Sequence, residues 1–588
     1  MAKEGGYKIE NFYQGGYSTF KPNNIPGITT GSLGLTTDPR NANVLQEVSS
    51  KLSSGVKQIE LEMVSPDSFD QVPKQQFEEL RRLQKLTGVD VSVHGPVIDT
   101  TGVSQQGYSE LNREYSEKKI LEALKRSFEL NPDGNVSVNF HTSEGIPGSE
   151  WKTLGGEGKE RTAKKLIVVN RESGKLAPLE GETMFYPGHD LEKGEFKTPE
   201  WRVDNLNGSE WDNSISQLIF NKEKADEILQ KSEPVLRKVM DNEGKLKYSM
   251  EEIQKSPVTM QALNHYQNAA EYIKDTEQHI NSLFNRAFTY GTDEQKQVLK
   301  KLSENFKTEI EKNEYDLSLR SNALQKLLLT MKNHQLAPDV YVPFDEFAVE
   351  QSSKTFGNAA FESWKQFKNN SPIVNIENPP ATHALSTGED VANVVRESRK
   401  HFVERAVKEG VSKSEAEKQA EKLIGATWDV GHINMLRRQG FNEKDIIKET
   451  EKVAPFVKHI HLSDNFGMEH TELPMGMGNV PLKEMMEKLG KQGVDSRKII
   501  EAAHWWQHFK SSPVQVSLEG LGSPVYSGGG PYWSQNIGLQ QGYLGGYGMM
   551  LPQGNYQMFG AGWAQLPVEL GGQMPGAQGS RMSGHSME

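Results

Sequence analysis

Short runs that read as β-strands alternate with helical segments along most of this chain, in two blocks. The first block ends near residue 146 and the second begins near residue 372. The strand-like runs are Ile28–Leu35, Val56–Met63, Val89–His94, Val136–His141, Pro372–Glu377, Ala426–Val430, Val457–Leu462 and Lys498–Glu501. Strand–helix alternation is typical of right-handed βαβ units and a parallel sheet, and eight such units predict a TIM (β/α)8 barrel of the α/β class.

Residues 147–368 do not continue this alternation. They open with a hairpin pattern, in which Leu166–Val169 and a second run through Met184–Tyr186 flank a turn. Helical periodicity follows over Met260–Phe288 and again over Asp293–Met331, with apolar side chains at helical spacing. The sequence therefore predicts a large, mainly helical insertion after the fourth strand of the barrel.

Changes of pattern divide the chain into five parts. We expect an irregular arm, a first half-barrel, the inserted hairpin and helices, a second half-barrel and a low-complexity tail; these span 1–26, 27–146, 147–368, 369–515 and 516–588. The tail is rich in Gly and aromatic residues and poor in charge, which is typical of disordered segments. The insertion and the tail are our candidates for oligomerisation or protein contacts.

Cysteine is absent from the 588 residues, which excludes disulfides, thiolate zinc sites, iron–sulfur clusters and cysteine nucleophiles. A metal site in this chain must use His, Asp and Glu. The net charge of −12 and the pI near 5.8 do not favour a nucleic-acid partner. Because the sequence has no apolar leader and no long apolar run, we expect a cytoplasmic protein without membrane spans.

The stretch Val457–Val480 combines a strand pattern with ligand-type side chains. Side chains alternate along a strand, so His459 and His461 point the same way, and we expect His459 to lie one layer deeper, in the core. A polar loop with Asp464 and His470 follows the strand. Taken alone, this stretch fits a metal site and a pair of core histidines equally well.

The same arrangement recurs at the ends of strands three to eight. The His, Asp and Glu residues at these ends are His94, His141, Glu377, Asp429, His432, His461, His470 and Glu501. Catalysis is built on the rim formed by the carboxyl ends of barrel strands, and imidazole and carboxylate groups bind divalent zinc, manganese or iron. A lone His is more often a hydrogen-bonded core residue than a ligand, but six consecutive strands of this kind predict a metal site.

Seven short motifs along the chain resemble those of the xylose-isomerase-like TIM barrels. This superfamily includes the endonuclease IV-type apurinic/apyrimidinic endonucleases (AP endonuclease family 2) and the sugar isomerases and epimerases. The motifs are Ser92–Pro96, Phe140–His141, Ile376–Asn378, Asp429–His432, His461–Asp464, His470 with Gly476–Gly478, and Ile499–Glu501. The resemblance covers about residues 28–145 and 370–510 and implies a metal-dependent enzyme.

Resemblance to the endonuclease branch implies a phosphodiester hydrolase, for example one that cleaves DNA at abasic sites, with two or three zinc ions. The implied ligand groups are His94, His141 and Glu377 for one ion; Glu377, Asp429, His461 and Glu501 for a second; and His432 and His470 for a third. Clustered ions of this kind generate a hydroxide and stabilise the attacking and leaving oxygens of a phosphodiester. The presence of both His94 and His141 favours this branch, which is our main hypothesis.

Resemblance to the isomerase and epimerase branch implies a single Mn²⁺ or Mg²⁺ ion and a sugar-type substrate. The ion would be held by Glu377, Asp429, His461 and Glu501. Glu377 and Glu501 would then also act as catalytic acid and base, and His432 would bind the substrate.

Three departures from the endonuclease pattern count against a role in DNA repair. Met468 stands where that pattern has an Asp ligand, Val97 stands where it has a Tyr, and the rim has no Arg/Lys-rich patch for phosphates. These departures weaken the main hypothesis without replacing it, and isomerase or epimerase activity is the second hypothesis. A third hypothesis is a non-enzymatic, metal-binding interaction protein.

Three further side chains near the rim are candidates for the site. Asp464 is a candidate for orienting a metal ligand, and a helix-capping role fits it about as well. Trp505 and Trp506 are candidates for a wall that binds a sugar or a base, although packing of the rim is the commoner role for such aromatic residues.

Overall fold

The computed structural model describes residues 30–521 except for short gaps, which are 42, 66–68, 70, 154–160, 189–191, 242–245, 313–315, 334–335, 503–504, 506–508 and 510–511. The expected arm at 1–26 lies outside the described residues, and so does the expected tail at 516–588 from residue 522 onward. The first residues of that expected tail belong to helix α17 (Val514–Gly520). The chain divides into two compact units. The first comprises Met1–Thr101, Arg113–Ile146 and Gln351–Glu588, and the second comprises Gly102–Asn112 and Pro147–Glu350.

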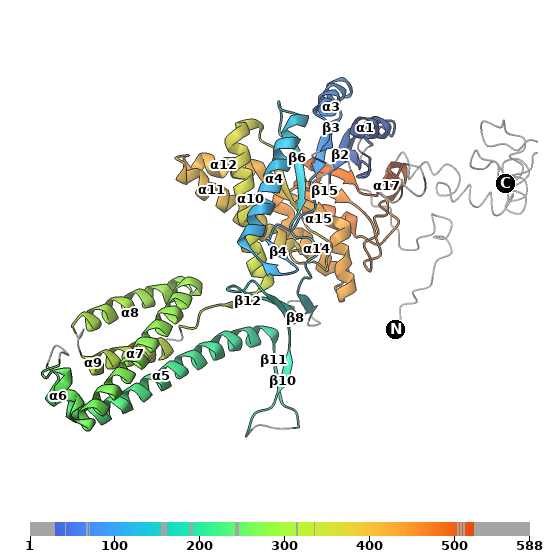
Figure 1. Cartoon of the computed structure of the whole chain (residues 1–588). Helices are drawn as coiled ribbons and strands as arrows, with labels where there is room; N and C mark the ends of the chain where they lie inside the picture. The colour runs from blue at the N-terminus through green and yellow to red at the C-terminus, as the bar shows by residue number, and fades with distance from the viewer. Residues whose placement is uncertain are drawn as a thin grey trace, which may run out of the picture. The chain divides into compact units, whose positions relative to one another are not determined.

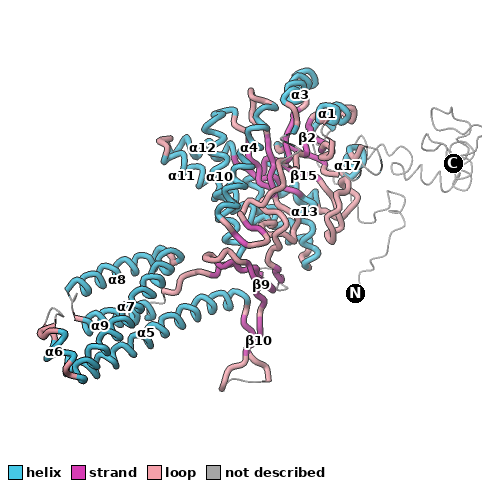
Figure 2. The backbone as a smooth tube through the Cα atoms, in the orientation of Figure 1, coloured by secondary structure: helices cyan, strands magenta, loops and turns pink. Residues whose placement is uncertain are grey.

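Eight parallel strands form a closed barrel in the first unit, which confirms the predicted TIM barrel. The barrel strands are β1 (Leu33–Thr36), β2 (Gln58–Glu62), β3 (Asp90–His94), β6 (Ser137–His141), β13 (Ile373–Glu377), β14 (Ile424–Asp429), β15 (Val457–Leu462) and β16 (Arg497–Ile500). They follow one another around the barrel in this order, and β16 pairs with β1 to close it. Figure 2 shows these strands at the centre of the unit, with helices around them.

Helices alternate with these strands along the chain. They are α1 (Val44–Leu52), α3 (Lys74–Thr87), α4 (Glu110–Leu130), α10 (Phe344–Phe367), α11 (Gly388–Lys408), α12 (Lys413–Leu423), α14 (Glu443–Val453) and α15 (Leu482–Asp495). Local sequence fixes several of their ends. Thr387 and Asp390 form a capping box at the start of α11, and Gly88 ends α3 with a φ of 69°, which glycine adopts without strain.

The strands of the barrel are buried almost throughout, because helices cover their outer faces and side chains fill the interior. All six residues of β14 are buried, and Trp428 is fully buried. The interior also holds polar side chains in a hydrogen-bonded network. Asn139 on β6 accepts a bond from Thr427 at 2.8 Å and donates one to Glu60 at 2.5 Å. This polar interior leads to the carboxyl ends of the strands, where the predicted ligands lie.

The second unit contains a small sheet and a group of long helices. Strands β12 (Tyr341–Pro343), β8 (Arg161–Asn170) and β7 (Glu150–Thr153) are neighbours in the sheet, and β9 (Leu176–Glu180) also pairs with β8. The hairpin β4–β5 (Val103–Ser104 and Gly107–Tyr108) and the hairpin β10–β11 (Glu182–Met184 and Glu195–Lys197) belong to this unit as well.

The long helices of the second unit are α5 (Pro199–Val239), α7 (Pro257–Tyr290), α8 (Asp293–Lys312) and α9 (Leu317–Asn333), with a short α6 (Met250–Gln254) between the first two. They lie side by side in Figure 1 and bury a shared cluster that includes Trp211, Ile273 and Leu328. The single helix expected over Asp293–Met331 is therefore two helices, α8 and α9. The boundary between the two units falls at Glu350, inside helix α10. No helix in the described ranges is both long and apolar enough to cross a lipid bilayer.

Candidate metal centre

Strand register brings the predicted ligands to the carboxyl end of the barrel. Three pairs of neighbouring strand ends are in register: Glu62 with His94, His141 with Glu377, and Asp429 with His461. Glu501 follows directly after β16, and its backbone amide donates to the carbonyl of Leu462 at 3.1 Å. Residues that are hundreds of positions apart in sequence therefore meet at one rim.

Glu377 is the centre of this group of side chains. Its Oε1 lies 2.7 Å from Nδ1 of His461, and that same nitrogen lies 3.2 Å from Oε2 of Glu501. On the other side, Oε2 of Glu377 lies 3.4 Å from Nε2 of His94 and 3.8 Å from Nε2 of His141. Glu377 and His461 are fully buried, whereas the side chain of Glu501 is 13% exposed and faces the mouth of the barrel.

The end of β14 and the short helix that follows it position two further side chains, Asp429 and His432. Asp429 ends β14 and caps the short helix α13 (Val430–Asn434) by accepting a bond from the amide of His432 at 2.6 Å. Nδ1 of His432 is 2.8 Å from the carbonyl of Asn378, which leaves Nε2 facing Nε2 of His470 at 2.8 Å. His432 is buried, but the side chain of His470 is 39% exposed.

Three groups of side chains in the described part of the chain have donor atoms close enough to hold a metal ion. They are His94, His141 and Glu377; Glu377, Asp429, His461 and Glu501; and Glu60, His459 and His461. The first two are the groups that the resemblance implies for the first and second ions. His432 and His470 belong to none of the groups among the described residues, so the group implied for a third ion is not assembled there.

The donor atoms themselves fit a divalent cation. Oε2 of Glu377 and Oε2 of Glu501 are buried without a hydrogen-bond partner. A buried carboxylate oxygen without a donor is costly, and a metal ion is one of the groups that satisfies it. Imidazole nitrogen and carboxylate oxygen are the ligands expected of zinc, manganese or iron, and the absence of cysteine agrees with this.

Burial and neighbouring charges shift the pKa values of the four side chains strongly. Burial alone would lower the pKa of His461, but Glu377, Glu501 and Glu60 raise it well above its usual value. Burial would likewise raise the pKa of Glu377 and of Glu501, but the charge of His461 lowers both. Burial and the nearby Glu501 raise the pKa of Asp429 well above its usual range. The protein therefore keeps two ionised glutamates beside a charged imidazole at the mouth of the barrel.

The pair formed by His432 and His470 is different. Burial and the neighbouring His470 lower the pKa of His432 to about 3, so this imidazole is neutral at neutral pH. Its contact with the carbonyl of Asn378 assigns the proton to Nδ1. The lone pair of Nε2 therefore points to the rim, where it can accept a hydrogen bond.

Two residues of this site carry no motif in the sequence, namely Glu60 and Glu62 on β2. Both are buried, and they alternate with Ile59 and Leu61 in a strand whose two faces are covered. Glutamate at alternate positions of a strand inside a parallel barrel is a signal in itself, because those side chains must point either into the packed interior or into the helix layer. His459, expected in the core, is indeed fully buried, and its Nε2 lies 3.1 Å from Glu60.

Asp464 shapes the loop that carries His470. Its carboxylate accepts bonds from the backbone amides of Asn465, Gly476 and Val480 at 2.9, 2.9 and 3.1 Å. The loop passes very close to this carboxylate, since a Cβ atom on Gly478 would lie 2.3 Å from Oδ1 of Asp464. These bonds tie together the loop backbone on either side of His470.

The aromatic candidates are only partly described. Trp505 is partly buried and lies against Phe509, with ring centroids 4.2 Å apart, whereas Trp506 lies outside the described residues. Met468, at the position of an expected ligand, has 57% of its surface exposed.

Comparison with known proteins gives limited matches. No family model matches the chain. An uncharacterized protein of Methanocaldococcus jannaschii is 31% identical over 93 residues, which make up 16% of this chain and 30% of that protein. The chain therefore spans less than a third of the length of this curated relative.

Two solved structures align over most of the chain with low scores. A D-tagatose 3-epimerase-like protein covers 83% of this chain and 98% of its own, with 12% identity and a TM-score of 0.31. The 3-keto-D-glucoside 4-epimerase YcjR from E. coli covers 83% and 97%, with 10% identity and a TM-score of 0.29. These scores are too low to carry an argument about activity. The structure itself confirms the predicted TIM barrel, by a closed parallel barrel of eight strands.

Proposed function

We propose that this chain is a divalent-metal-dependent isomerase or epimerase that acts on a sugar-type substrate. The observation that carries the proposal is the meeting of Glu377, Asp429, His461 and Glu501 at the mouth of the barrel. Two of these side chains, Glu377 and Glu501, each keep one buried carboxylate oxygen without a hydrogen-bond partner. This set is complete for one cation and also places two ionised carboxylates beside it.

The chemistry requires proton transfer at a carbon next to a carbonyl group. One carboxylate removes the proton from that carbon, and a proton is returned either to the opposite face of the same carbon, which is epimerisation, or to the neighbouring carbon, which is aldose–ketose isomerisation. Glu377 and Glu501 are the residues we assign to these two transfers. A cation held by the four residues would stabilise the negative charge that develops on the substrate oxygen.

His432 is the residue we assign to substrate binding. Its Nδ1 is held by the carbonyl of Asn378, so its neutral Nε2 is available to accept a hydrogen bond from a sugar hydroxyl. His470 lies 2.8 Å from that nitrogen and is partly exposed, so a hydroxyl that enters between the two imidazoles can bond to both. The partly buried Trp505 is the candidate for contact with the apolar face of a sugar ring.

Solvent hydrogen exchange tests this proposal on many sugars in parallel. The metal-stripped chain is reloaded with Mn²⁺, Mg²⁺, Co²⁺ or Zn²⁺ and incubated in D2O with a panel of aldoses, ketoses and keto-glycosides. We expect deuterium next to the carbonyl carbon of at least one sugar, only with metal present, and none with Glu377→Gln or Glu501→Gln. Absence of exchange across the panel with a fully loaded protein would count against the proposal.

A phosphodiester hydrolase of the endonuclease type remains the second candidate, because one specific observation favours it. His94 and His141 form a second ligand group with Glu377, so this carboxylate is shared between two groups, as in a two-ion site. The lack of a third group around His432 and His470 in the described residues and the net charge of −12 weigh against abasic DNA as the substrate. Metal-dependent cleavage of an oligonucleotide with one abasic site, lost in His94→Ala, would move the function to this class.

A further inference from the structure

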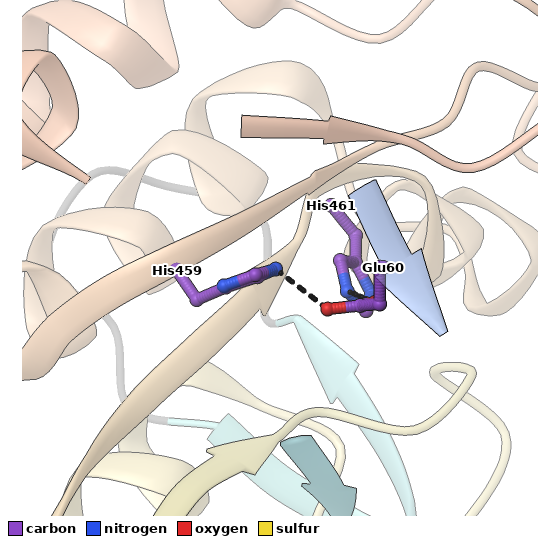
Figure 3. Close-up of side chains that lie close together, drawn as sticks. All are labelled: Glu60, His459 and His461. Carbon is purple, nitrogen blue, oxygen red and sulfur yellow. Dashed lines mark hydrogen bonds and ion pairs between the residues drawn. The ribbon is translucent and has the colours of Figure 1, made fainter. Parts of the chain in front are cut away.

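Beneath the rim, a second cluster links Glu60 to His461 and His459. Figure 3 shows the carboxylate of Glu60 between the two imidazoles. Its Oε1 lies 2.8 Å from Nε2 of His461, and its Oε2 lies 3.1 Å from Nε2 of His459. All three side chains are fully buried. His461 therefore belongs both to this cluster and to the proposed metal centre.

His461 has a carboxylate oxygen at each of its two ring nitrogens. Nδ1 faces Glu377 at 2.7 Å, and Nε2 faces Glu60 at 2.8 Å. A neutral imidazole has one lone pair and one N–H, and the hydrogen bond made by one nitrogen decides which nitrogen can bind a metal. The charged imidazole donates from both nitrogens; loss of the Nδ1 proton would keep the Nε2–H on Glu60 and leave a lone pair on Nδ1, directed at Glu377 and Glu501.

We propose that Glu60 is a positioning residue for the metal centre: its carboxylate accepts the Nε2–H of His461 and thereby directs the Nδ1 lone pair of that imidazole to the cation. This inference rests on the proposed function, because it assumes that His461 is a ligand. It adds a residue that neither the motifs nor the predicted ligand set contains. Glu60 acts through His461 and does not itself touch the substrate.

The surroundings of Glu60 are built to hold an ionised carboxylate in this orientation. Ser92 donates to Oε2 at 2.8 Å, and Asn139 donates to the same oxygen at 2.5 Å. Asn139 is also 3.4 Å from Nε2 of His461, but its much shorter contact shows that Glu60 is its acceptor. Three strands, β2, β3 and β6, thus supply the carboxylate and two of its donors. A rigid acceptor of this kind fixes both the tautomer and the ring orientation of the histidine.

A separate metal ion bound by Glu60, His459 and His461 is the alternative occupant of this cluster. Two observations disfavour it. The oxygens of Glu60 already accept bonds from side chains on three strands, and His461 cannot give a lone pair from both nitrogens while it stays neutral. Hydrogen bonds therefore account for Glu60 and His461 with no ion between them.

The experiment compares metal affinity and histidine tautomer in the full chain. The protein is stripped of metal and titrated calorimetrically with Mn²⁺ and with Zn²⁺, in the wild type and in Glu60→Gln, Glu60→Ala and Glu60→Asp. We expect the dissociation constant to rise about 10- to 100-fold in Glu60→Ala and Glu60→Gln, the range typical of losing such an outer partner, and less in Glu60→Asp, which keeps the charge. The matched control is Glu449→Gln, since Glu449 is equally buried but lies on α14.

The tautomer gives a readout that loss of stability alone would not change. Long-range ¹H–¹⁵N correlation spectra of the ¹⁵N-histidine-labelled, Zn²⁺-loaded chain, with His461 assigned by His461→Gln, should show the proton on Nε2 in the wild type. In Glu60→Ala that preference should weaken, whereas Glu449→Gln should keep it. If Glu60→Gln does not fold, Glu60→Asp and the wild-type spectrum still decide the matter.

Each result has a definite meaning. Affinities within threefold of the wild type in all Glu60 variants, or a wild-type proton on Nδ1, would overturn the inference while leaving the proposed function intact. Loss of one whole ion per chain in the Glu60 variants, with the affinity of a remaining ion unchanged, would overturn it in favour of a separate site. A wild-type chain that binds no ion would instead refute the proposed function, and the role of Glu60 at a metal with it.

Discussion

Nδ1 of His461 lies 2.7 Å from Oε1 of Glu377, although the two residues are 84 positions apart in the sequence. They stand on β15 and β13, on either side of β14, and the parallel register brings the ends of these strands to the same level. This contact joins the two ligand groups of the rim to the buried cluster around Glu60. Substitutions of different rim residues should be distinguishable by three measurements: turnover, metal binding and proton release.

Removing either proposed proton-transfer residue should abolish turnover without unfolding the protein. We expect Glu377→Gln and Glu501→Gln to lower kcat by at least about 10²-fold, because general acid–base catalysis contributes on that order. Glu449→Gln, at a buried glutamate of α14, should leave kcat unchanged. Full activity in both rim variants, measured on the sugar identified by deuterium exchange, would show that the catalytic pair is misassigned.

His470 should matter for substrate binding and not for metal content. It pairs with His432 at 2.8 Å but belongs to no group of three ligands in the described part of the chain. In His470→Ala we expect an unchanged number of metal ions per chain and a KM about fivefold higher, the effect of losing one hydrogen bond. A drop of one ion per chain, measured by plasma mass spectrometry, would instead support a third metal site of the endonuclease type.

Metal binding should release protons and should weaken as the pH falls. Burial alone would lower the pKa of His461, but its carboxylate neighbours raise it well above 6.5, and burial raises the pKa of Asp429 above its usual range. Both groups therefore hold a proton more tightly in the metal-free protein than the free side chains do, and ligands must lose their protons to bind. Calorimetry in two buffers of different ionisation enthalpy should show net proton release and an affinity that increases with pH. Equal heats in the two buffers would contradict this.

The loop after β15 should tolerate no side chain at Gly478. A Cβ atom there would lie 2.3 Å from Oδ1 of Asp464 and 2.4 Å from the carbonyl oxygen of Asn465. We expect Gly478→Ala to destabilise the protein by about 1–3 kcal/mol, as overpacking does, and to raise KM by displacing the loop that carries His470. Gly208→Ala is a useful contrast, since Gly208 lies within helix α5 with open space around it and alanine there should stabilise by up to about 1 kcal/mol. Thermal unfolding measures both, and a Gly478→Ala protein as stable as the wild type would refute the close-packed loop.

The barrel was predictable from the sequence because each of its elements carries a local pattern. The strands are short apolar runs bounded by Gly and Pro, and alternation alone identifies a parallel barrel. The helices of the second unit were harder. Helix α5 runs over 41 residues, yet Gly208 and Pro234 interrupt its pattern. The break between α8 and α9 carries one short signal, Asp316, whose carboxylate accepts bonds from the amides of Ser318 and Leu319 at the start of α9. Packing on the shared apolar cluster, not local propensity, determines these helices.

The site was predictable only at the ends of strands. Four of the six residues end a strand, His461 is the last residue but one of β15, and Glu501 follows β16; the four are His94, His141, Glu377 and Asp429. The structure brings all six together in two ligand groups that share Glu377. Glu60 lies within β2, and its partners Ser92 and Asn139 lie within two other strands, so only the register of the closed barrel places them beside His461. A contact that depends on closure of a sheet leaves no mark at a fixed spacing in the sequence.

The number of metal ions per chain tests the central claim most directly. The full chain is purified without chelator or affinity histidines, reloaded with Mn²⁺, Zn²⁺, Mg²⁺ or Co²⁺, and measured by plasma mass spectrometry beside His461→Ala. We predict one tightly held ion in the wild type and its loss in His461→Ala, because His461 lies at the centre of the ligand set. A wild-type chain that holds no ion after reloading, or a His461→Ala chain that keeps its ion, would contradict the account.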